Sequence, residues 1–222
     1  PVGISLLEDP GGQVLADVAD RTQPEPDLGA GVLQVGVHGT GVDARSVHEH
    51  AVPAEHAIRG FHGVTLLLDD ARKTAAVLTD VFGFKETARE GSVIRFTAAG
   101  DVNGSVVDIY EAKGFLRGHQ GGGSVHHIAF RAADDTEQGS MAQRLVDNHG
   151  LHPTEQKDRN YFRSIYFREP GGVLFEVATD IPGFAVDEPV ATLGAALKLP
   201  SFLEPHRKEI EGVLPKLEGA VS

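Results

Sequence analysis

Two stretches of the chain follow one order of segments, and this repetition constrains the fold more than any local pattern. Residues 60–70 (GFHGVTLLLDD) form a strand-like run before a helical segment that ends at about Phe82, and strand-like runs follow at about 92–97 and 105–111. The same order begins again at residue 124, with a helical segment to about His149 and further runs at about 161–168 and 173–179. Apolar periodicity of this kind indicates a βαβββ unit that occurs more than once. We therefore predict an α+β fold in which tandem βαβββ units form curved, half-open β-barrels.

The two predicted helices carry signals at their ends. Asp134 precedes the second helix and is expected to cap it, and Asp70 holds the corresponding place before the first helix. Gly83 and Gly150 follow the two helices, where glycine commonly ends a helix. We assign residues 60–115 to a degenerate βαβββ unit and residues 122–180 to the unit with the richer chemistry.

The beginning of the chain resembles the end of such a unit. Residues 8–17 (EDPGGQVLAD) align without a gap with residues 168–177 (REPGGVLFEV). We therefore interpret residues 1–20 as the last two strands of a βαβββ unit whose first strand and helix are absent, and the chain as the C-terminal part of a longer protein.

The remaining segments are less regular. Residues 21–59 are rich in Gly, Pro, Asp and His, and we interpret them as a linker with one strand at Val32–Val37. Residues 181–222 form a tail with a helix predicted over Glu204–Leu217. Its apolar face is expected to pack on the sheet, although a helix that binds a partner protein is the alternative; that face comprises Ile210, Val213, Leu214 and Leu217.

Composition excludes several classes of function. A formal net charge of -12 argues against nucleic acid or an anionic membrane as the main partner. The absence of cysteine excludes disulfides, thiolate metal sites and a cysteine nucleophile. No apolar run approaches the roughly 20 residues that span a bilayer. We therefore expect a soluble, cytoplasmic protein.

A carboxylate in an apolar strand is the strongest chemical signal. Glu176 lies in residues 171–178 (GGVLFEVA), and burial of its charge costs several kcal/mol unless a positive group meets it. The pair His126–His127 lies in another apolar run, residues 124–130 (SVHHIAF). Imidazole and carboxylate without thiolate suit Fe(II), Mn(II), Zn(II) or Ni(II), and form two-thirds of the 2-His-1-carboxylate arrangement of non-haem iron enzymes.

The repeat indicates which histidine faces the carboxylate. If Asp70 and Asp134 are equivalent, Gly63 aligns with His127, His62 with His126, and Asp108 with Glu176. The last unit alone then has a histidine on its first strand and a glutamate on its fourth. Because neighbouring strand residues point to opposite faces, we expect only one of the two histidines to be a ligand.

Simpler explanations remain for these residues. The two histidines can be partly buried, hydrogen-bonded residues, and Arg159 or Arg163 can be the partner of Glu176. Tyr166 can lie at a surface with its hydroxyl in water, or hydrogen bond to a substrate oxygen. A His62–Asp108 site would be the remnant of a second metal site. The linker histidines could bind zinc adventitiously; they are His48, His50 and His56.

The motifs resemble those of the vicinal oxygen chelate superfamily, which includes glyoxalases, extradiol dioxygenases and bleomycin-resistance proteins. The chain is most similar to ring-cleaving dioxygenases that open hydroquinones, including chlorohydroquinone 1,2-dioxygenases. The motifs that carry this resemblance are residues 124–131 (SVHHIAFR), 158–162 (DRNYF), 164–172 (SIYFREPGG), 182–184 (PGF), 187–188 (DE) and 199–204 (LPSFLE).

The resemblance implies Fe(II)-dependent, extradiol-type ring cleavage of a hydroquinone or related dihydroxy-aromatic with O2. It assigns His127 and Glu176 as iron ligands, and His126, Arg159 and Tyr166 as residues around the substrate. His126 would act as acid and base, and Arg159 and Tyr166 would hold the substrate oxygens. The family's other histidine ligand belongs to an N-terminal unit that this chain largely lacks. By analogy, a homodimer is also expected.

Two other functions remain open on the same scaffold. A glyoxalase-type isomerase or lyase would use Ni(II) or Zn(II) and need no O2. A non-catalytic module would bind an aromatic ligand without any metal.

Overall fold

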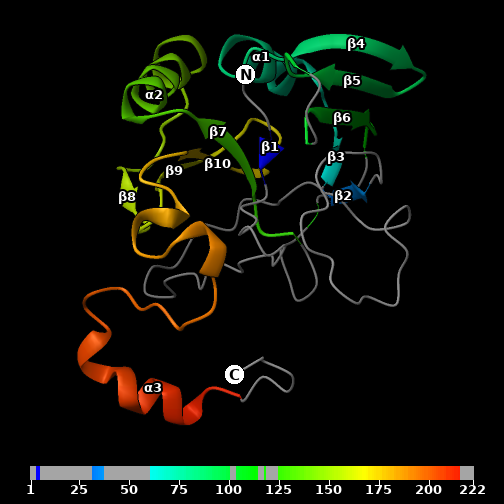
Figure 1. Ribbon diagram of the computed structural model, residues 1–222. Helices are drawn as coiled ribbons and strands as arrows, with labels where there is room; N and C mark the ends of the chain where they lie inside the picture. Colours follow the sequence, from blue (N-terminus) through cyan, green and yellow to red (C-terminus); the bar gives the residue numbers. More distant parts are fainter. Residues whose placement is uncertain are drawn as a thin grey trace.

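The structure is a computed structural model of the 222-residue chain (Figure 1). It describes residues 61–100, 104–114, 118 and 125–215, together with the backbone of two short strands at residues 4–5 and 32–37. Residues 8–17 and the three linker histidines lie outside this set, and so does Leu217.

The first unit has the predicted order of elements. Its sheet runs β2-β3-β6-β5-β4, in which β3 is parallel to β6 and every other pair is antiparallel. The strand predicted at Val32–Val37 is confirmed as β2, at the edge beside β3. The elements are β3 (Phe61–Leu68), α1 (Arg72–Asp80), β4 (Lys85–Glu90), β5 (Val93–Thr97) and β6 (Val106–Glu111).

The second unit repeats this topology. Its sheet runs β1-β7-β10-β9-β8, with β7 parallel to β10 and the short strand β1 (Ile4–Ser5) antiparallel to β7. The α+β prediction with tandem βαβββ units is therefore confirmed, and neither sheet closes into a barrel. The elements are β7 (Ile128–Ala132), α2 (Asp135–His149), β8 (Lys157–Asp158), β9 (Arg163–Arg168) and β10 (Leu174–Thr179).

The two helices begin differently. The Asp134 carboxylate accepts a hydrogen bond from the Glu137 amide at 2.9 Å, which confirms it as the cap of α2. Helix α1 instead begins after Ala71, whose side chain caps nothing. Asp70 accepts from the Arg72 amide at 2.9 Å and pairs with the Arg72 guanidinium, so it forms a local turn before the helix.

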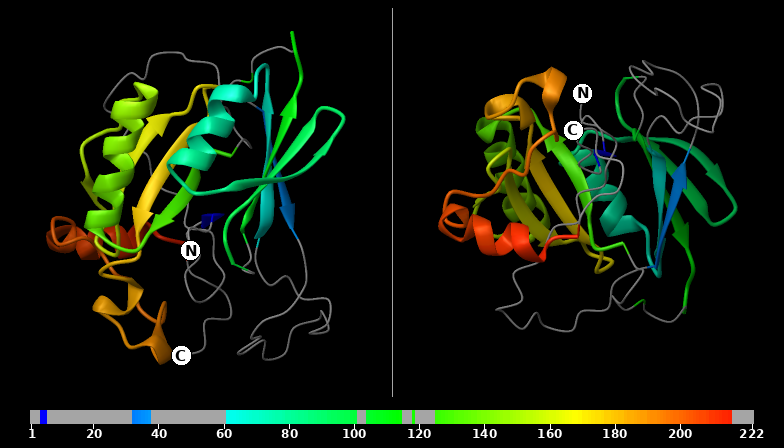
Figure 2. Two further views of the ribbon diagram at one scale, coloured as in Figure 1. Left: turned by 90° about the horizontal axis from the view of Figure 1, so that it is seen from above. Right: turned by 60° about the horizontal axis from the view of Figure 1, so that its bottom comes forward.

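A single apolar core joins the two units. Phe82, just after α1, stacks on Phe130 of β7 with ring centroids 3.9 Å apart, and both are almost fully buried. Helices α1 and α2 lie side by side (Figures 1 and 2), and Arg144 of α2 donates to the Val81 carbonyl at 2.9 Å. Thr74 of α1 donates to the buried carboxylate of Glu169, which follows β9. These contacts join the two units through their helices and one shared core.

The tail differs from the prediction. After three short 3-10 helices, α3 covers only Arg207–Val213 and lies apart from both sheets (Figure 1). Val213 is 83% exposed and Leu214 is 45% exposed, so the expectation that this face packs on the sheet is wrong for these residues. The helix ends early because Pro215 disfavours the helical conformation at Leu214, which is extended.

Within the part of the chain that the structure describes, no helix has the length and apolar character needed to cross a membrane.

Candidate metal centre

Glu176 lies in the middle of the second sheet. It is on β10, opposite Ala129 of β7 on one side and Tyr166 of β9 on the other. Its neighbours Phe175 and Val177 point into the core, so Glu176 points to the opposite face of the sheet, where it is only 1% exposed. A carboxylate this deeply buried needs compensating partners.

His127 and Ser164 are those partners. The His127 Nε2 atom lies 2.7 Å from Glu176 Oε2, and the Ser164 hydroxyl donates to Oε1. Burial raises the pKa of Glu176, but His127 and Ser164 lower it by more, so the net pKa is below its ordinary value. Glu176 is therefore held as a carboxylate, the form that binds a cation.

The atoms of this pair fit a metal ion. Glu176 Oε2 is buried, and no donor among the described residues meets it in good hydrogen-bond geometry, although His127 Nε2 is close enough to lower the pKa of the carboxyl. Two N and O ligands about 2.1 Å from one ion and at right angles to each other would be about 3 Å apart. The observed 2.7 Å is near that separation. Within the described residues no third His, Asp or Glu joins them, so the structure brings together the two residues that the sequence predicts as metal ligands.

His126 lies against His127, contrary to one expectation. We expected the two side chains on opposite faces of a strand, but β7 begins only at Ile128 and both histidines precede it. Their rings are in edge contact, and their Nδ1 atoms are 2.8 Å apart. If His127 Nε2 held a cation, its Nδ1 would carry the proton and donate to His126 Nδ1, and His126 would then fix the ring orientation and tautomer of His127.

Tyr166 and Arg159 complete the arrangement. The Tyr166 ring meets the His127 ring edge-on with centroids 5.9 Å apart, and the Arg159 guanidinium lies 5.7 Å from the Tyr166 ring centre. Arg159 Nη2 is 3.5 Å from the Tyr166 hydroxyl. Burial, and then the charge of Glu176, raise the pKa of Tyr166 to about 12, so its phenol keeps a proton to donate.

The Arg163 alternative for Glu176 loses its basis. Arg163 forms its ion pair with Asp135 at 2.7 Å, whereas Glu176 contacts His127 and Ser164. Sequence reasoning missed Ser164, which binds the carboxylate directly. Its position two residues before Tyr166, on the same face of β9, was the available signal.

The corresponding position of the first unit holds an ion pair. Asp108 of β6 lies opposite Thr65 of β3 and Arg95 of β5, which is the register of Glu176 with Ala129 and Tyr166. Arg95 donates to both oxygens of Asp108, at 2.8 and 2.7 Å. His62 and Asp108 therefore do not form a second metal site, because the guanidinium occupies both carboxylate oxygens.

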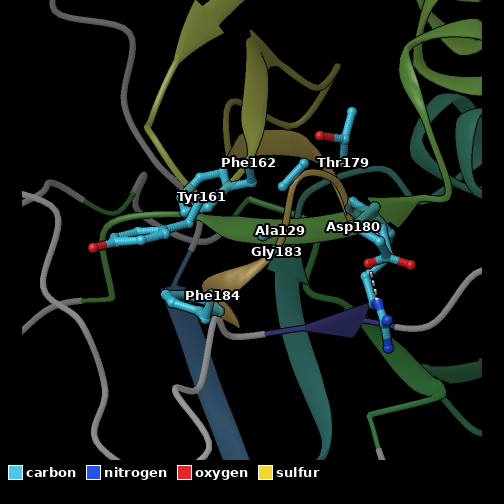
Figure 3. Close-up of a pocket in the computed structure, with 10 residues that line it drawn as sticks. Ala129, Tyr161, Phe162, Thr179, Asp180, Gly183 and Phe184 are labelled. Atoms are coloured by element: carbon cyan, nitrogen blue, oxygen red, sulfur yellow. Dashed lines mark hydrogen bonds and ion pairs between the residues drawn. The ribbon is translucent and has the colours of Figure 1, made fainter. Parts of the chain in front are cut away.

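A pocket opens farther along the same face of the second sheet (Figure 3). Its floor contains Ala129 and Ala178, which follow His127 and Glu176 by two residues in the sequence. Tyr161 and Phe184 lie on one side of it and Asp180 on the other.

The chain has well-defined relatives. Residues 60–177 match the Glyoxalase/Bleomycin resistance protein/Dioxygenase superfamily. A Bacillus subtilis (strain 168) protein named "Putative ring-cleaving dioxygenase MhqO" is 48% identical over 165 residues, which are 74% of this chain and 52% of that protein. A chlorohydroquinone/hydroquinone 1,2-dioxygenase of Sphingobium indicum is 35% identical over 164 residues, 72% of this chain and 50% of that enzyme.

A solved structure extends this likeness to three dimensions. The crystal structure of a "putative dioxygenase" from Bacillus subtilis is 46% identical and superposes with a TM-score of 0.68, covering 76% of this chain and 53% of that one. The chain thus spans about half the length of the relatives it matches. The βαβββ repeat, the strand register and these matches agree that the chain belongs to the Glyoxalase/Bleomycin resistance protein/Dioxygenase superfamily.

Proposed function

We propose that this chain provides two iron ligands, His127 and Glu176, of an Fe(II)-dependent dioxygenase that opens a hydroquinone or related dihydroxy-aromatic ring by extradiol-type cleavage. One observation carries the proposal: a buried carboxylate oxygen without a hydrogen bond lies 2.7 Å from an imidazole nitrogen. The relatives named as ring-cleaving dioxygenases supply the reaction class.

Iron is the metal that best suits this ligand set and this reaction. Mn(II), Ni(II) and Zn(II) also accept imidazole and carboxylate, but the 2-His-1-carboxylate set with open positions is typical of Fe(II) oxygenases. The chemistry that the bound ion supplies is electron transfer between ring and O2, held side by side. We propose that the third ligand belongs to the part of the relatives that this chain does not match.

The proposed proton carrier is His126. Its Nδ1 accepts a hydrogen bond from His127 Nδ1, which leaves its own proton on Nε2. His126 is exposed whereas His127 is half-buried, so its outer nitrogen can reach a substrate hydroxyl. The Nε2–H of His126 would then donate to a ring oxygen. His126 would take the proton of a ring hydroxyl only in its other tautomer, with its own proton on Nδ1 and the hydrogen bond to His127 Nδ1 broken, and would return that proton to the opened product.

Tyr166 and Arg159 would hold the substrate oxygens. The Tyr166 phenol keeps its proton, and the guanidinium beside it is always charged. A neutral donor and a cation placed together stabilise negative charge as it develops on a ring oxygen. Such a pair would position the ring and favour its ionised form.

A metal titration tests this proposal. The chain would be titrated with Fe(II) without oxygen, alone and after fusion to the unmatched half of MhqO. We expect weak binding alone and binding tighter by orders of magnitude in the fusion, because a third ligand is then present. His127→Ala should abolish that gain and His62→Ala should not.

The outcomes separate the alternatives. O2 uptake with hydroquinones by the iron-loaded fusion supports the dioxygenase. Turnover of a hemithioacetal with Ni(II) or Zn(II) and without O2 would instead establish a glyoxalase-type enzyme. Aromatic binding by a fusion that holds no metal would establish a binding module. Tight Fe(II) binding by the chain alone that His62→Ala removes would overturn the ligand assignment.

A further inference from the structure

The segment after β10, residues 183–187, contacts Tyr161 in three ways. The Gly183 amide donates to the Tyr161 carbonyl at 2.8 Å. The Phe184 ring stacks on the Tyr161 ring, with centroids 5.1 Å apart and an angle of 23° between the planes (Figure 3). The Tyr161 hydroxyl donates to the Asp187 carboxylate at 3.1 Å. The segment therefore holds this tyrosine by its backbone, its ring and its hydroxyl.

Tyr161 belongs to a tight turn that also carries Arg159. The Tyr161 amide donates to the Arg159 carbonyl at 2.8 Å, and the Arg159 amide donates to the Phe162 carbonyl at 2.9 Å. Asn160 lies between them with a φ of 64°, and its amide donates to the Asp158 carboxylate at 2.8 Å. Asparagine adopts this left-handed conformation more readily than most residues. The turn therefore fixes the backbone of Arg159 relative to that of Tyr161.

The strand before this turn gives it little support. Strand β8 has only two residues, Lys157 and Asp158, and both are exposed. The equivalent strand of the first unit, β4, has six residues and pairs with β5 as far as Glu90. A two-residue strand holds a turn weakly, because few ladder hydrogen bonds and no buried side chain fix it. The turn therefore depends on contacts from outside its hairpin, and residues 183–187 make three of them with Tyr161.

The position of the turn sets the reach of Arg159. Its guanidinium lies 5.7 Å from the Tyr166 ring centre, and Nη2 is 3.5 Å from the Tyr166 hydroxyl. A displacement of about 1 Å would take Nη2 out of hydrogen-bond reach of that hydroxyl. An arginine side chain has many rotamers, so a fixed backbone is needed to keep its charged end in one place.

We propose that Tyr161, Phe184 and Asp187 are positioning residues, which hold the turn and thereby hold the Arg159 guanidinium over Tyr166. The inference rests on the proposed function, because that function gives the guanidinium and the phenol their role of holding substrate oxygens. Loss of a positioning residue should affect the substrate rather than the metal, since His127 and Glu176 are held by other contacts.

Nuclear magnetic resonance of the whole, metal-free chain tests the positioning directly. The chain has three tyrosines, so tyrosine labelled at Cζ gives three signals, which single Tyr→Phe substitutions assign. We expect a nuclear Overhauser effect (NOE) between the Arg159 side chain and the Tyr166 ring. Phe184→Ala should abolish this NOE and shift the Tyr166 signal, because the turn is released and the guanidinium leaves the phenol.

Val186→Ala is the matched control. Val186 lies in the same 3-10 helix, Phe184–Val186, and is 57% exposed. Its truncation should leave the NOE and the Tyr166 signal unchanged. Phe184→Tyr keeps an aromatic ring in the stack and should retain both. A folded Phe184→Ala variant that keeps the wild-type NOE would overturn the proposal.

A milder pair of variants tests the same role if Phe184→Ala disturbs the fold. Tyr161→Phe and Asp187→Ala each remove the hydrogen bond between hydroxyl and carboxylate and leave the ring stack in place. Each should weaken the NOE between Arg159 and Tyr166. The double variant should lose no more than either single variant, because all three lack the same bond. An unchanged NOE in both single variants would contradict the positioning role of this bond.

Kinetics of the iron-loaded fusion give the functional readout. Phe184→Ala should lower kcat/KM for hydroquinone by about tenfold, through loss of one charge-assisted contact to a substrate oxygen. Its Fe(II) affinity should stay unchanged, and Val186→Ala should change neither quantity. A matching fall in Fe(II) affinity would show that residues 183–187 support the metal centre as a whole, and would overturn the proposal.

The positioning role and the reaction can fail separately. If Phe184→Ala abolishes the NOE but the iron-loaded fusion consumes no O2, the proposed function is wrong and the positioning role stands. If the fusion consumes O2 and the NOE persists in every variant, the positioning role is wrong and the reaction stands.

Discussion

The two βαβββ units have the same topology, but a carboxylate at the equivalent position has different partners in each. Asp108 and Glu176 occupy equivalent places, each opposite the first strand of its unit and beside the third. In the first unit a guanidinium satisfies both oxygens of the carboxylate. In the second unit one oxygen binds Ser164, and the other lies near an imidazole without a hydrogen bond. The difference shows that one scaffold can either pair a carboxylate with a guanidinium or leave one of its oxygens beside an imidazole.

The first strands explain why only one unit can carry the histidine. Gly63, the counterpart of His127, lies inside β3, and a Cβ there would clash with the Val106 carbonyl oxygen. In the second unit β7 begins one residue after His127. His127 is therefore outside the regular strand, where an imidazole fits. The shorter strand creates the space for the ligand.

The largest expected effect concerns the two carboxylates. Glu176→Gln in the fusion protein should lower the affinity for Fe(II) by more than about 100-fold, since it removes a charged ligand. Asp108→Asn should leave that affinity unchanged. Anaerobic metal titration measures the Fe(II) affinity of both variants. An equal loss in the two would contradict the prediction that only Glu176 binds the metal.

The next effect tests the space at Gly63. Gly63→Ala should destabilise the chain by about 3 kcal/mol, because its methyl group meets backbone atoms that cannot move aside. Gly139→Ala in α2 is the control, since nothing lies within 4 Å of its Cβ, and it should stabilise by about 1 kcal/mol. Urea unfolding gives both values. A loss below about 0.5 kcal/mol for Gly63→Ala would show that the first unit has room for a side chain.

The connection between the units is the third test. Glu169→Ala should cost about 2 kcal/mol, because it leaves Thr74 and the Val173 amide without their buried acceptor. Glu169→Gln should cost less, since an amide of the same shape can bind both. If both substitutions leave the unfolding free energy unchanged, Glu169 does not join the units.

The contribution of Glu169 to the free energy of unfolding should also depend on pH. Burial raises the pKa of this carboxyl above its ordinary value of 4.5. The folded state then binds its proton more tightly than the unfolded state, so this stabilisation is complete below 4.5 and is lost as the pH rises through the folded pKa. Wild type should lose stability relative to Glu169→Gln over that range, as unfolding curves at several pH values would show.

The smallest effect compares the helix starts. Asp134→Ala should cost about 1 kcal/mol through loss of the α2 cap. Asp70→Ala should cause no measurable loss, because its exposed ion pair with Arg72 caps nothing. Thermal unfolding compares the two, and equal losses would mean that both aspartates cap as the sequence suggested.

Patterns within the sequence predicted much of the fold because they report local physics. The alternation of apolar residues, the Asp134 cap and Gly150 in its left-handed conformation define where the second helix begins and ends. The same reasoning placed Asp70 as a cap and extended the last helix to Leu217. It was wrong where a neighbour decided the outcome: Arg72 at the first site and Pro215 at the second.

The site was only partly predictable for a related reason. The repeat predicted a histidine on the first strand and Glu176 on the fourth strand of the last unit, and the structure brings His127 and Glu176 together. The contact between His126 and His127 and the role of Ser164 could not be derived, because both depend on where β7 begins and which face of β9 meets Glu176.

The sequence by itself determined the repeated units, the unit in which a metal centre is proposed and the absence of thiolate ligands from this chain, because periodicity and residue type need no long-range contact. Three features came from the tertiary structure alone. One Glu176 oxygen is buried without a hydrogen bond, Arg95 neutralises Asp108, and a pocket lies over Ala129 and Ala178. Each of these depends on side chains from separate strands, whose distances are set only when the sheet forms.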